Sequence, residues 1–158
     1  MAARVSPAVR KSMRSNRSSG TQLEKLVARI LRAENLLPPP KLNDWQLPGS
    51  PDFSWRRPRI ALFVDGCFWH SCPRHHPLSA RRMPKTNTKF WATKFARNRN
   101  RDRRNDRDLA KLGWIVIRVW ECTVKGNPAR MLDALEEASE AGGPRITRVT
   151  PTGRRRKR

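Results

Sequence analysis

The sequence predicts a small α/β domain in which a mixed central sheet is flanked by helices. Segments with helical spacing of apolar residues alternate with short apolar runs typical of buried strands. Their order is helix, strand, strand, helix, strand, helix, which favours a layered α/β architecture. The chain of 158 residues is long enough for one domain with a substantial core, and it contains no recognisable internal repeat.

The first helix is predicted over the segment TQLEKLVARILRAENL, where apolar residues recur at helical spacing. Thr21 and Glu24 have the spacing of a capping box at its start, and the sequence PPP is expected to end it. The segments PDFSW and RIALFVD predict two strands. The second strand should be fully buried because its apolar run is continuous.

A long helix is predicted from about Thr88 to Leu112, closed by Gly113. One face of this helix is apolar at both ends and polar in the middle. It consists of Trp91, Phe95, Asn98, Asp102, Asn105, Leu109 and Leu112, which follow one another at alternating steps of four and three. An inward-facing Asp102 would belong either to a satisfied polar network or to an active site.

The segment WIVIRVWEC predicts a further buried strand. Asn127 and Pro128 then open a last helix, which ends at the sequence AGG. This interpretation divides the chain into a flexible basic arm over residues 1–19, a domain over residues 20–142 and a basic disordered tail over residues 143–158. We expect the arm to become ordered on DNA.

Charge is the strongest feature of the composition. The chain has 35 lysines and arginines against 13 acidic residues, a formal net charge of +22, which indicates a polyanionic partner such as nucleic acid.

The sequence has no apolar run of about 18 residues, so no membrane span is predicted. The first residues have charges but no apolar core of a secretory signal, and their arginine and serine content would also suit a transit peptide. We expect an intracellular protein.

Two aspartates border the predicted strand pair. Asp52 precedes one strand and Asp65 ends the next, so adjacent strands would bring both carboxylates to the same rim of the sheet. Carboxylate oxygens suit Mg²⁺, which can stabilise phosphoryl charge and activate a water. Alternatively, both are turn residues, since aspartate is common beside proline and glycine.

The loop after the second strand holds several potential metal ligands. Cys67, Cys72 and His75 have the spacing C-x4-C-x2-H, and the distant Cys122 directly follows a buried strand. Four thiolate and imidazole ligands suggest a tetrahedral zinc site that ties the loop to the sheet. His76 is the alternative histidine ligand, and ordinary buried thiols are the alternative to a metal site.

Phe68, Trp69 and His70 lie between the two cysteines of this loop. The aromatic side chains belong either to the core or to a wedge that enters DNA between base pairs. His70 is the histidine nearest in sequence to the two aspartates, and a neutral imidazole there could act as a general base toward water. Otherwise it is one more histidine of the zinc loop.

Five stretches together resemble the very-short-patch repair (Vsr) DNA mismatch endonuclease family: LPGSPDF, FVDGCFWHSCPRH, NTKFW, KFARNRNRD and LGWIVIRVWEC. The resemblance covers about residues 10–125. It implies a restriction-endonuclease-like fold and an Mg²⁺-dependent enzyme that nicks one DNA strand on the 5′ side of the thymine in a T:G mismatch. Such mismatches arise when 5-methylcytosine deaminates.

The resemblance also implies roles for individual residues of the active site. Asp52 matches the central Mg²⁺-binding aspartate, and Val64 matches a residue that offers its backbone carbonyl to the metal. His70 matches the catalytic histidine. Glu24 and Asp102 match acidic residues of the active site, although a capping box alone would explain Glu24.

Other matches concern DNA and zinc. Phe68 and Trp69 match the aromatic residues that enter the duplex at the mismatch, and Met13 matches a residue that inserts from the opposite groove. Cys67 and Cys122 match structural zinc ligands. By the same resemblance we expect a monomer in the bacterial cytoplasm, associated with the nucleoid, with other mismatch-repair proteins as further partners.

The chain departs from the family pattern at two places. Asp65 stands where the pattern has a histidine before GCFWH, and an acid there could add a metal ligand. The sequence SCPRHH places Cys72 before the histidines, so the assignment of the zinc set follows from the spacing in this chain. Many nucleases have a lysine two residues after the second acid, and this chain has Cys67 there. His70 is therefore the residue that would act as a general base.

Three functional hypotheses follow from the sequence. The first is the mismatch nicking enzyme. The second is a related restriction-type DNA endonuclease with a different target. The third is a DNA-binding protein that is stabilised by zinc and has no catalytic activity. The clustered carboxylates argue against this hypothesis, because they would not help to bind a polyanion.

Overall fold

The computed structural model describes residues 21–70, 72–75 and 86–150. Its elements in chain order are α2 (Gln22–Glu34), β1 (Lys41–Leu42), β2 (Phe53–Trp55), β3 (Ile60–Asp65), α3 (Thr88–Lys111), β4 (Ile115–Trp120), α4 (Glu121–Gly126), α5 (Ala129–Ala141) and β5 (Arg145–Val149). The predicted arm with Met13, as well as His76, lies outside the described residues. Among these elements, no helix combines the length and apolar character needed to cross a bilayer.

The five strands form one mixed sheet in the order β1-β2-β3-β4-β5. β2 is antiparallel to both of its neighbours, β1 and β3, whereas β3, β4 and β5 run parallel. In the register of the parallel part, Ile60 lies opposite Ile115 and Asp65 lies opposite Trp120. The predicted mixed sheet is therefore confirmed.

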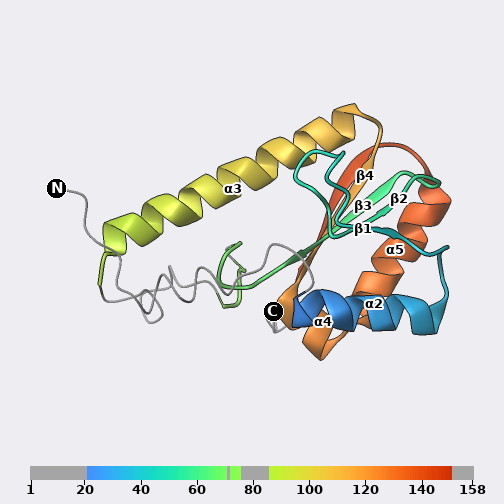
Figure 1. Cartoon of the computed structure of the whole chain (residues 1–158), viewed down its shortest axis with the longest axis horizontal. Coiled ribbons are helices and arrows are strands. Elements are labelled where there is room, and N and C mark those ends of the chain that lie inside the picture. The colour runs from blue at the N-terminus through green and yellow to red at the C-terminus, as the bar shows by residue number, and fades with distance from the viewer. Residues whose placement is uncertain (1–20, 71, 76–85, 151–158) are drawn as a thin grey trace, which may run out of the picture.

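Helices cover both faces of the sheet, as predicted (Figure 1). Because side chains alternate along a strand, Ile60 and Leu62 of β3 face a core shared with α2 and α5. Ala61 and Phe63 face the opposite way, toward Leu109 of α3. Figure 1 shows that the second half of α3 lies near the sheet while its first half extends beyond it.

The inner face of α3 is close to the predicted one. Trp91, Phe95, Asp102 and Leu109 are buried as expected. Leu112 was expected on this face but is 53% exposed, because α3 ends at Lys111 and Leu112 turns out of the helix.

Asp106 also lies on the inner face, although its polarity gave no reason to place it there. It is 1% exposed because it pairs with Arg118 of the sheet below.

Three elements differ from the sequence prediction. Residues 145–149 form β5 and pair with β4, so the predicted disordered tail over residues 143–158 is wrong in its first part. Residues 121–126 form the short helix α4, where no helix was predicted. The two-residue strand β1 was also missed, since it pairs with β2 without an apolar run of its own.

The capping box predicted at the start of α2 is confirmed, whereas α2 ends at Glu34, with Asn35 in the left-handed region, before the sequence PPP that was expected to end it. The Thr21 side chain accepts a hydrogen bond from the Glu24 N–H at 3.2 Å, which fixes the start of α2. The last helix begins just after Pro128 and ends at Ala141, followed by Gly142 and Gly143 at positive φ.

Gly49 ties the loop before β2 to α3, and its replacement should reduce stability. It adopts φ +78°, and a Cβ there would lie 2.6 Å from Asn105 Nδ2. We expect Gly49→Ala to lower the free energy of unfolding by about 1 to 3 kcal/mol. Gly126→Ala is the matched control, since nothing lies within 4 Å of its Cβ position. Urea unfolding of both variants measures the difference, and equal stability of the two would contradict the prediction.

Candidate active site and metal cluster

The sheet brings the predicted site residues to one edge. Since β3 and β4 are parallel, their carboxyl ends meet there, and β2 begins there because it is antiparallel to β3. Asp52 therefore precedes β2 at the edge where Asp65 ends β3. This confirms that adjacent strands bring the two carboxylates to the same rim.

Asp52 is held by the backbone of the neighbouring strand. Its Oδ2 accepts a hydrogen bond from the Val64 N–H at 2.7 Å. Burial raises the pKa of Asp52 to about 7; the Val64 hydrogen bond opposes this rise, and the charges of Glu24 and Asp65 add to it. Such a carboxyl group, crowded by other acids, is the kind that gains most from a bound cation.

An open cleft of about 900 Å³ lies against this edge. Its lining includes Glu24 and Arg29 of α2, Val64, Gly66, Trp69, His70, Lys94, Asn98, Arg101, Glu121 and Lys125. Glu24 therefore contacts the N-cap residue Thr21 and also lines the cleft, so its two sequence interpretations are compatible. The basic residues of the wall suit a polyanionic ligand.

His70 is clamped on one side by acids from two elements. Its Nδ1 lies 2.7 Å from Asp102 Oδ2 and 3.5 Å from Asp65 Oδ1. Burial by itself would lower the pKa of His70, but the hydrogen bond to Asp102 and the charges of both acids raise it above its ordinary value. Since the Nδ1 side is turned toward the acids, Nε2 is the ring nitrogen that can meet a water in the cleft.

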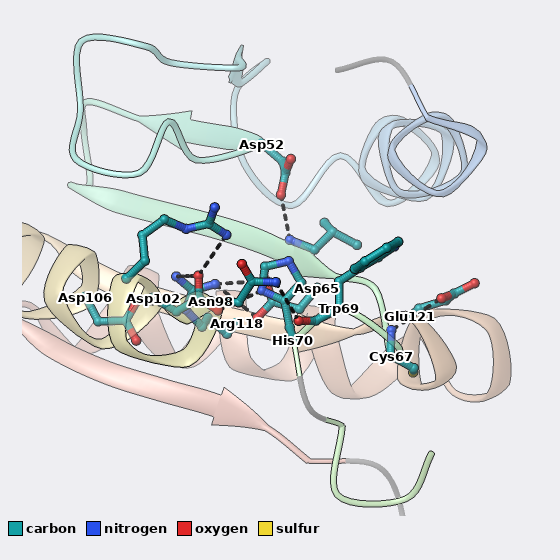
Figure 2. A network of polar contacts seen from close by, with 12 residues as sticks. Asp52, Asp65, Cys67, Trp69, His70, Asn98, Asp102, Asp106, Arg118 and Glu121 are labelled. Atoms are coloured by element: carbon teal, nitrogen blue, oxygen red, sulfur yellow. Dashed lines mark hydrogen bonds and ion pairs between the residues drawn. The ribbon is translucent and has the colours of Figure 1, made fainter. Parts of the chain in front are cut away.

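An arginine that sequence reasoning missed lies behind these groups. Arg118 of β4 is 3% exposed and contacts Asp65, Asp102 and Asp106. The available signal was a single arginine inside the apolar run IVIRVW, since a buried guanidinium requires acidic partners. Figure 2 shows Asp52 above β3, and Asp65, His70 and Arg118 gathered below it.

The four predicted zinc ligands converge on one point. The ligand atoms of Cys67, Cys72, His75 and Cys122 all lie within 4.8 Å of one another. Cys72 Sγ is 3.7 Å from Cys122 Sγ and 3.8 Å from His75 Nδ1. Metal–sulfur bonds of about 2.3 Å at tetrahedral angles separate sulfur atoms by about 3.8 Å, so this cluster could hold a metal ion.

The aromatic residues of the loop form a cluster with the first half of α3. The Phe68 ring meets Trp69, Trp91 and Phe95 edge-on, with centroids 4.8, 5.6 and 5.3 Å away. Trp91 and Phe95 are buried, whereas Phe68 is 37% exposed. Lys94 Nζ lies 4.9 Å from the Trp69 ring centroid. Phe68 and Trp69 are thus neither fully in the core nor free of it.

A cleft with carboxylates, a histidine and basic walls, in a chain of net charge +22, has the features of a nuclease site. Comparison with known proteins agrees. Residues 4–76 match the family model described as DNA mismatch endonuclease Vsr. The chain is 38% identical over 130 residues to the DNA mismatch endonuclease Vsr of Escherichia coli (strain K12), covering 82% of this chain and 80% of that protein.

Two further relatives are nicking enzymes. The Type II nicking enzyme V.NaeI of Lentzea aerocolonigenes is 38% identical over 70% of this chain and 66% of its own length. The Type II nicking enzyme V.XorIIP of Xanthomonas oryzae is 37% identical over 77% of this chain and 86% of its own length. The chain belongs to the Vsr family of DNA mismatch endonucleases, and it is a DNA endonuclease.

The raised pKa of Asp52 predicts an unusual pH dependence of stability. The folded-state pKa of about 7 lies above the ordinary value of 3.8, so the native state binds the proton more tightly than the unfolded chain. Without added divalent cation, stability should therefore fall as pH rises from about 4 to about 7. Asp52→Asn removes this loss and should stabilise the protein at pH 8 by about 1 to 3 kcal/mol.

Urea unfolding of the wild type and of Asp52→Asn at pH 5 and pH 8 measures this effect. Asp133→Asn, an exposed acid of α5, is the control and should show no gain at either pH. If the free energies of unfolding of the wild type and Asp52→Asn differ by the same amount at both pH values, the pKa of Asp52 is not raised.

Proposed function

We propose that the protein nicks double-stranded DNA on the 5′ side of the thymine in T:G mismatches, in an Mg²⁺-dependent hydrolysis that starts very-short-patch repair. The observation that carries this proposal is the half-buried Asp52 carboxyl, whose pKa is raised by burial and by the charges of Glu24 and Asp65, at the edge of the sheet next to the cleft that His70 and basic residues line. The relative named DNA mismatch endonuclease Vsr supports mismatched DNA as the substrate.

Asp52 and the backbone carbonyl of Val64 are the groups we assign to Mg²⁺ binding, with Asp65 as the further candidate from the sequence. Their fit rests on the donor set, since Mg²⁺ takes oxygen ligands, and on the burial that raises the pKa of Asp52. The ion supplies stabilisation of phosphoryl charge and a lowered pKa of water.

The chain's own groups supply positioning and proton transfer. His70, oriented by Asp102 at 2.7 Å, presents Nε2 to the cleft and accepts a proton from the attacking water. Glu24 faces the same cleft from α2 and supports this arrangement through water. The basic residues of the wall hold the DNA backbone, which contributes affinity without sequence preference.

We assign mismatch recognition to Phe68 and Trp69, together with Met13 outside the described residues. The partial exposure of Phe68 beside buried Trp91 leaves a hydrophobic edge that can enter a base step. A mismatch lowers the cost of unstacking, which is typically a few kcal/mol, and thereby contributes selectivity.

A structural zinc ion is our assignment for the Cys67–Cys72–His75–Cys122 cluster. His75→Ala should release the ion and lower the melting temperature by several degrees, because the loop then loses its connection to Cys122 of α4. Arg74→Ala, an exposed neighbour, is the control and should retain one zinc per chain. Metal analysis by mass spectrometry and thermal unfolding measure both effects. Equal zinc content in the two variants would contradict the assignment.

The architecture supports further assignments. We propose a restriction-endonuclease-like fold on the basis of the mixed sheet with helices on both faces. The endonuclease domain begins near residue 20 and extends to about residue 150, because β5 belongs to the sheet. Residues 1–19 serve as a DNA-contacting arm. We further propose a monomer in the bacterial cytoplasm, at the nucleoid because the substrate would be chromosomal DNA, with other mismatch-repair proteins as partners.

The second candidate function is that of a related restriction-type endonuclease that nicks a different DNA target. The observation in its favour is that several relatives are named Type II nicking enzymes. It shares the proposed site and differs only in the DNA that is cut.

Nicking of a labelled duplex tests the proposal. We expect the wild type to cut 5′ of the thymine in a T:G duplex when Mg²⁺ is added, and to leave the matched T:A duplex intact. Asp52→Ala should lower the rate at least about 100-fold while mismatch binding remains, because the metal contributes several kcal/mol of charge stabilisation. Asp133→Ala is the control and should cut normally.

Equal cutting of both duplexes would favour the second candidate function. Normal cutting by Asp52→Ala would overturn the metal assignment.

A further inference from the structure

Arg118 occupies a position where a charge is costly. It lies in β4, which has β3 on one side and β5 on the other, and its side chain is 3% exposed. Every other residue of β4 is apolar. A guanidinium in such a place persists only when acidic groups surround it, because desolvation costs several kcal/mol.

The guanidinium of Arg118 is fully surrounded. Nε lies 2.7 Å from Asp106 Oδ1, and Nη1 lies 2.8 and 3.0 Å from the two oxygens of Asp65. Nη2 lies 3.8 Å from Asp102 Oδ1, and the group stacks 4.2 Å from the Phe63 ring centroid. One side chain therefore joins β4, the end of β3 and the inner face of α3.

Both acids that face His70 are partners of Arg118. His70 Nδ1 lies 2.7 Å from Asp102 and 3.5 Å from Asp65, and both acids also contact Arg118 (Figure 2). A shift of Arg118 would therefore move both contacts at once. Arg118 is therefore linked to the His70 imidazole through the two acids.

We propose that Arg118 is a positioning residue of the active site, which withdraws Asp65 from metal binding and aligns His70 through Asp65 and Asp102. Nη1 contacts both oxygens of Asp65, so the carboxylate is directed into the protein and toward α3. The carboxylate of Asp52 is held differently. It accepts a hydrogen bond from the Val64 N–H, and Val64 is also the residue whose backbone carbonyl we assign to the metal.

Asp65 is the acid that stands where the family pattern has a histidine. Asp65 acts as the bridge between Arg118 and His70, and Asp52 remains the carboxylate that holds Mg²⁺. The inference rests on the proposed function for the place of the metal. Its contacts with Arg118 hold whichever DNA is cut.

The test is a double-mutant cycle with two readouts. The variants are Asp65→Asn, Arg118→Gln and the double variant, with Asp52→Asn as the metal-site reference. Arg148→Gln is the matched control, because Arg148 contacts the other oxygen of Asp106 at 2.6 Å and is 43% exposed. The readouts are the Mg²⁺-induced rise in melting temperature of the DNA-free protein and the nicking rate at saturating Mg²⁺ and DNA.

We expect Mg²⁺ to raise the melting temperature of Asp65→Asn as much as that of the wild type, and to leave Asp52→Asn unchanged. Arg118→Gln should nick at least about tenfold more slowly, with DNA affinity unchanged. The double variant should be no slower than Arg118→Gln alone, since both changes break one unit. Arg148→Gln should nick at the wild-type rate.

Two results would overturn the proposal: loss of the Mg²⁺ effect in Asp65→Asn, or rate losses that multiply in the double variant. If Arg118→Gln does not fold, Arg118→Lys keeps the charge, changes the contact geometry and takes its place in the cycle. If the wild type cuts a duplex other than T:G, the proposed function fails, and the cycle on that duplex still decides the role of Arg118.

Discussion

The parallel pairing of β3 with β4 is the constraint on which the whole site depends. In this register Asp65 lies opposite Trp120, so the residues that follow both strands leave the sheet at one edge. Cys67 follows β3 by two residues, and Cys122 lies in the first turn of α4, directly after β4. If β3 and β4 were antiparallel, the residues that follow the two strands would lie at opposite ends of the strand pair.

One short loop serves both the metal cluster and the catalytic cleft. Cys67 and Cys72 lie on either side of Trp69 and His70, so any ion held by the cysteines also limits the movement of the histidine. Asn98 of α3 adds a second restraint, because its side chain donates to the Trp69 carbonyl at 3.1 Å. Glu121 adds a third through the Cys67 N–H at 3.4 Å. Three restraints from two elements, α3 and α4, therefore fix the loop.

The sequence predicted what depends on local pattern. Helix spacing placed Asp102 inward, and strand order placed Asp52 and Asp65 at one rim. It could not predict which partner a buried charge would choose, because Arg118 and Asp106 meet only after β4 passes beneath α3. β5 was missed for a similar reason, since its exposed residues alternate with half-buried ones and give no apolar run. The roles of individual site residues remain proposals.

At the outer side of the parallel strands, β5 is the last strand of the described sheet, and it contains Arg145 and Arg148. An edge strand offers unpaired backbone groups to any other chain that can add a strand. Two copies joined along this border would bring like charges together, a repulsion that the pairing of Arg148 with Asp106 weakens and that low ionic strength strengthens. β5 thus completes the described sheet, and its arginines disfavour edge-to-edge association of two copies.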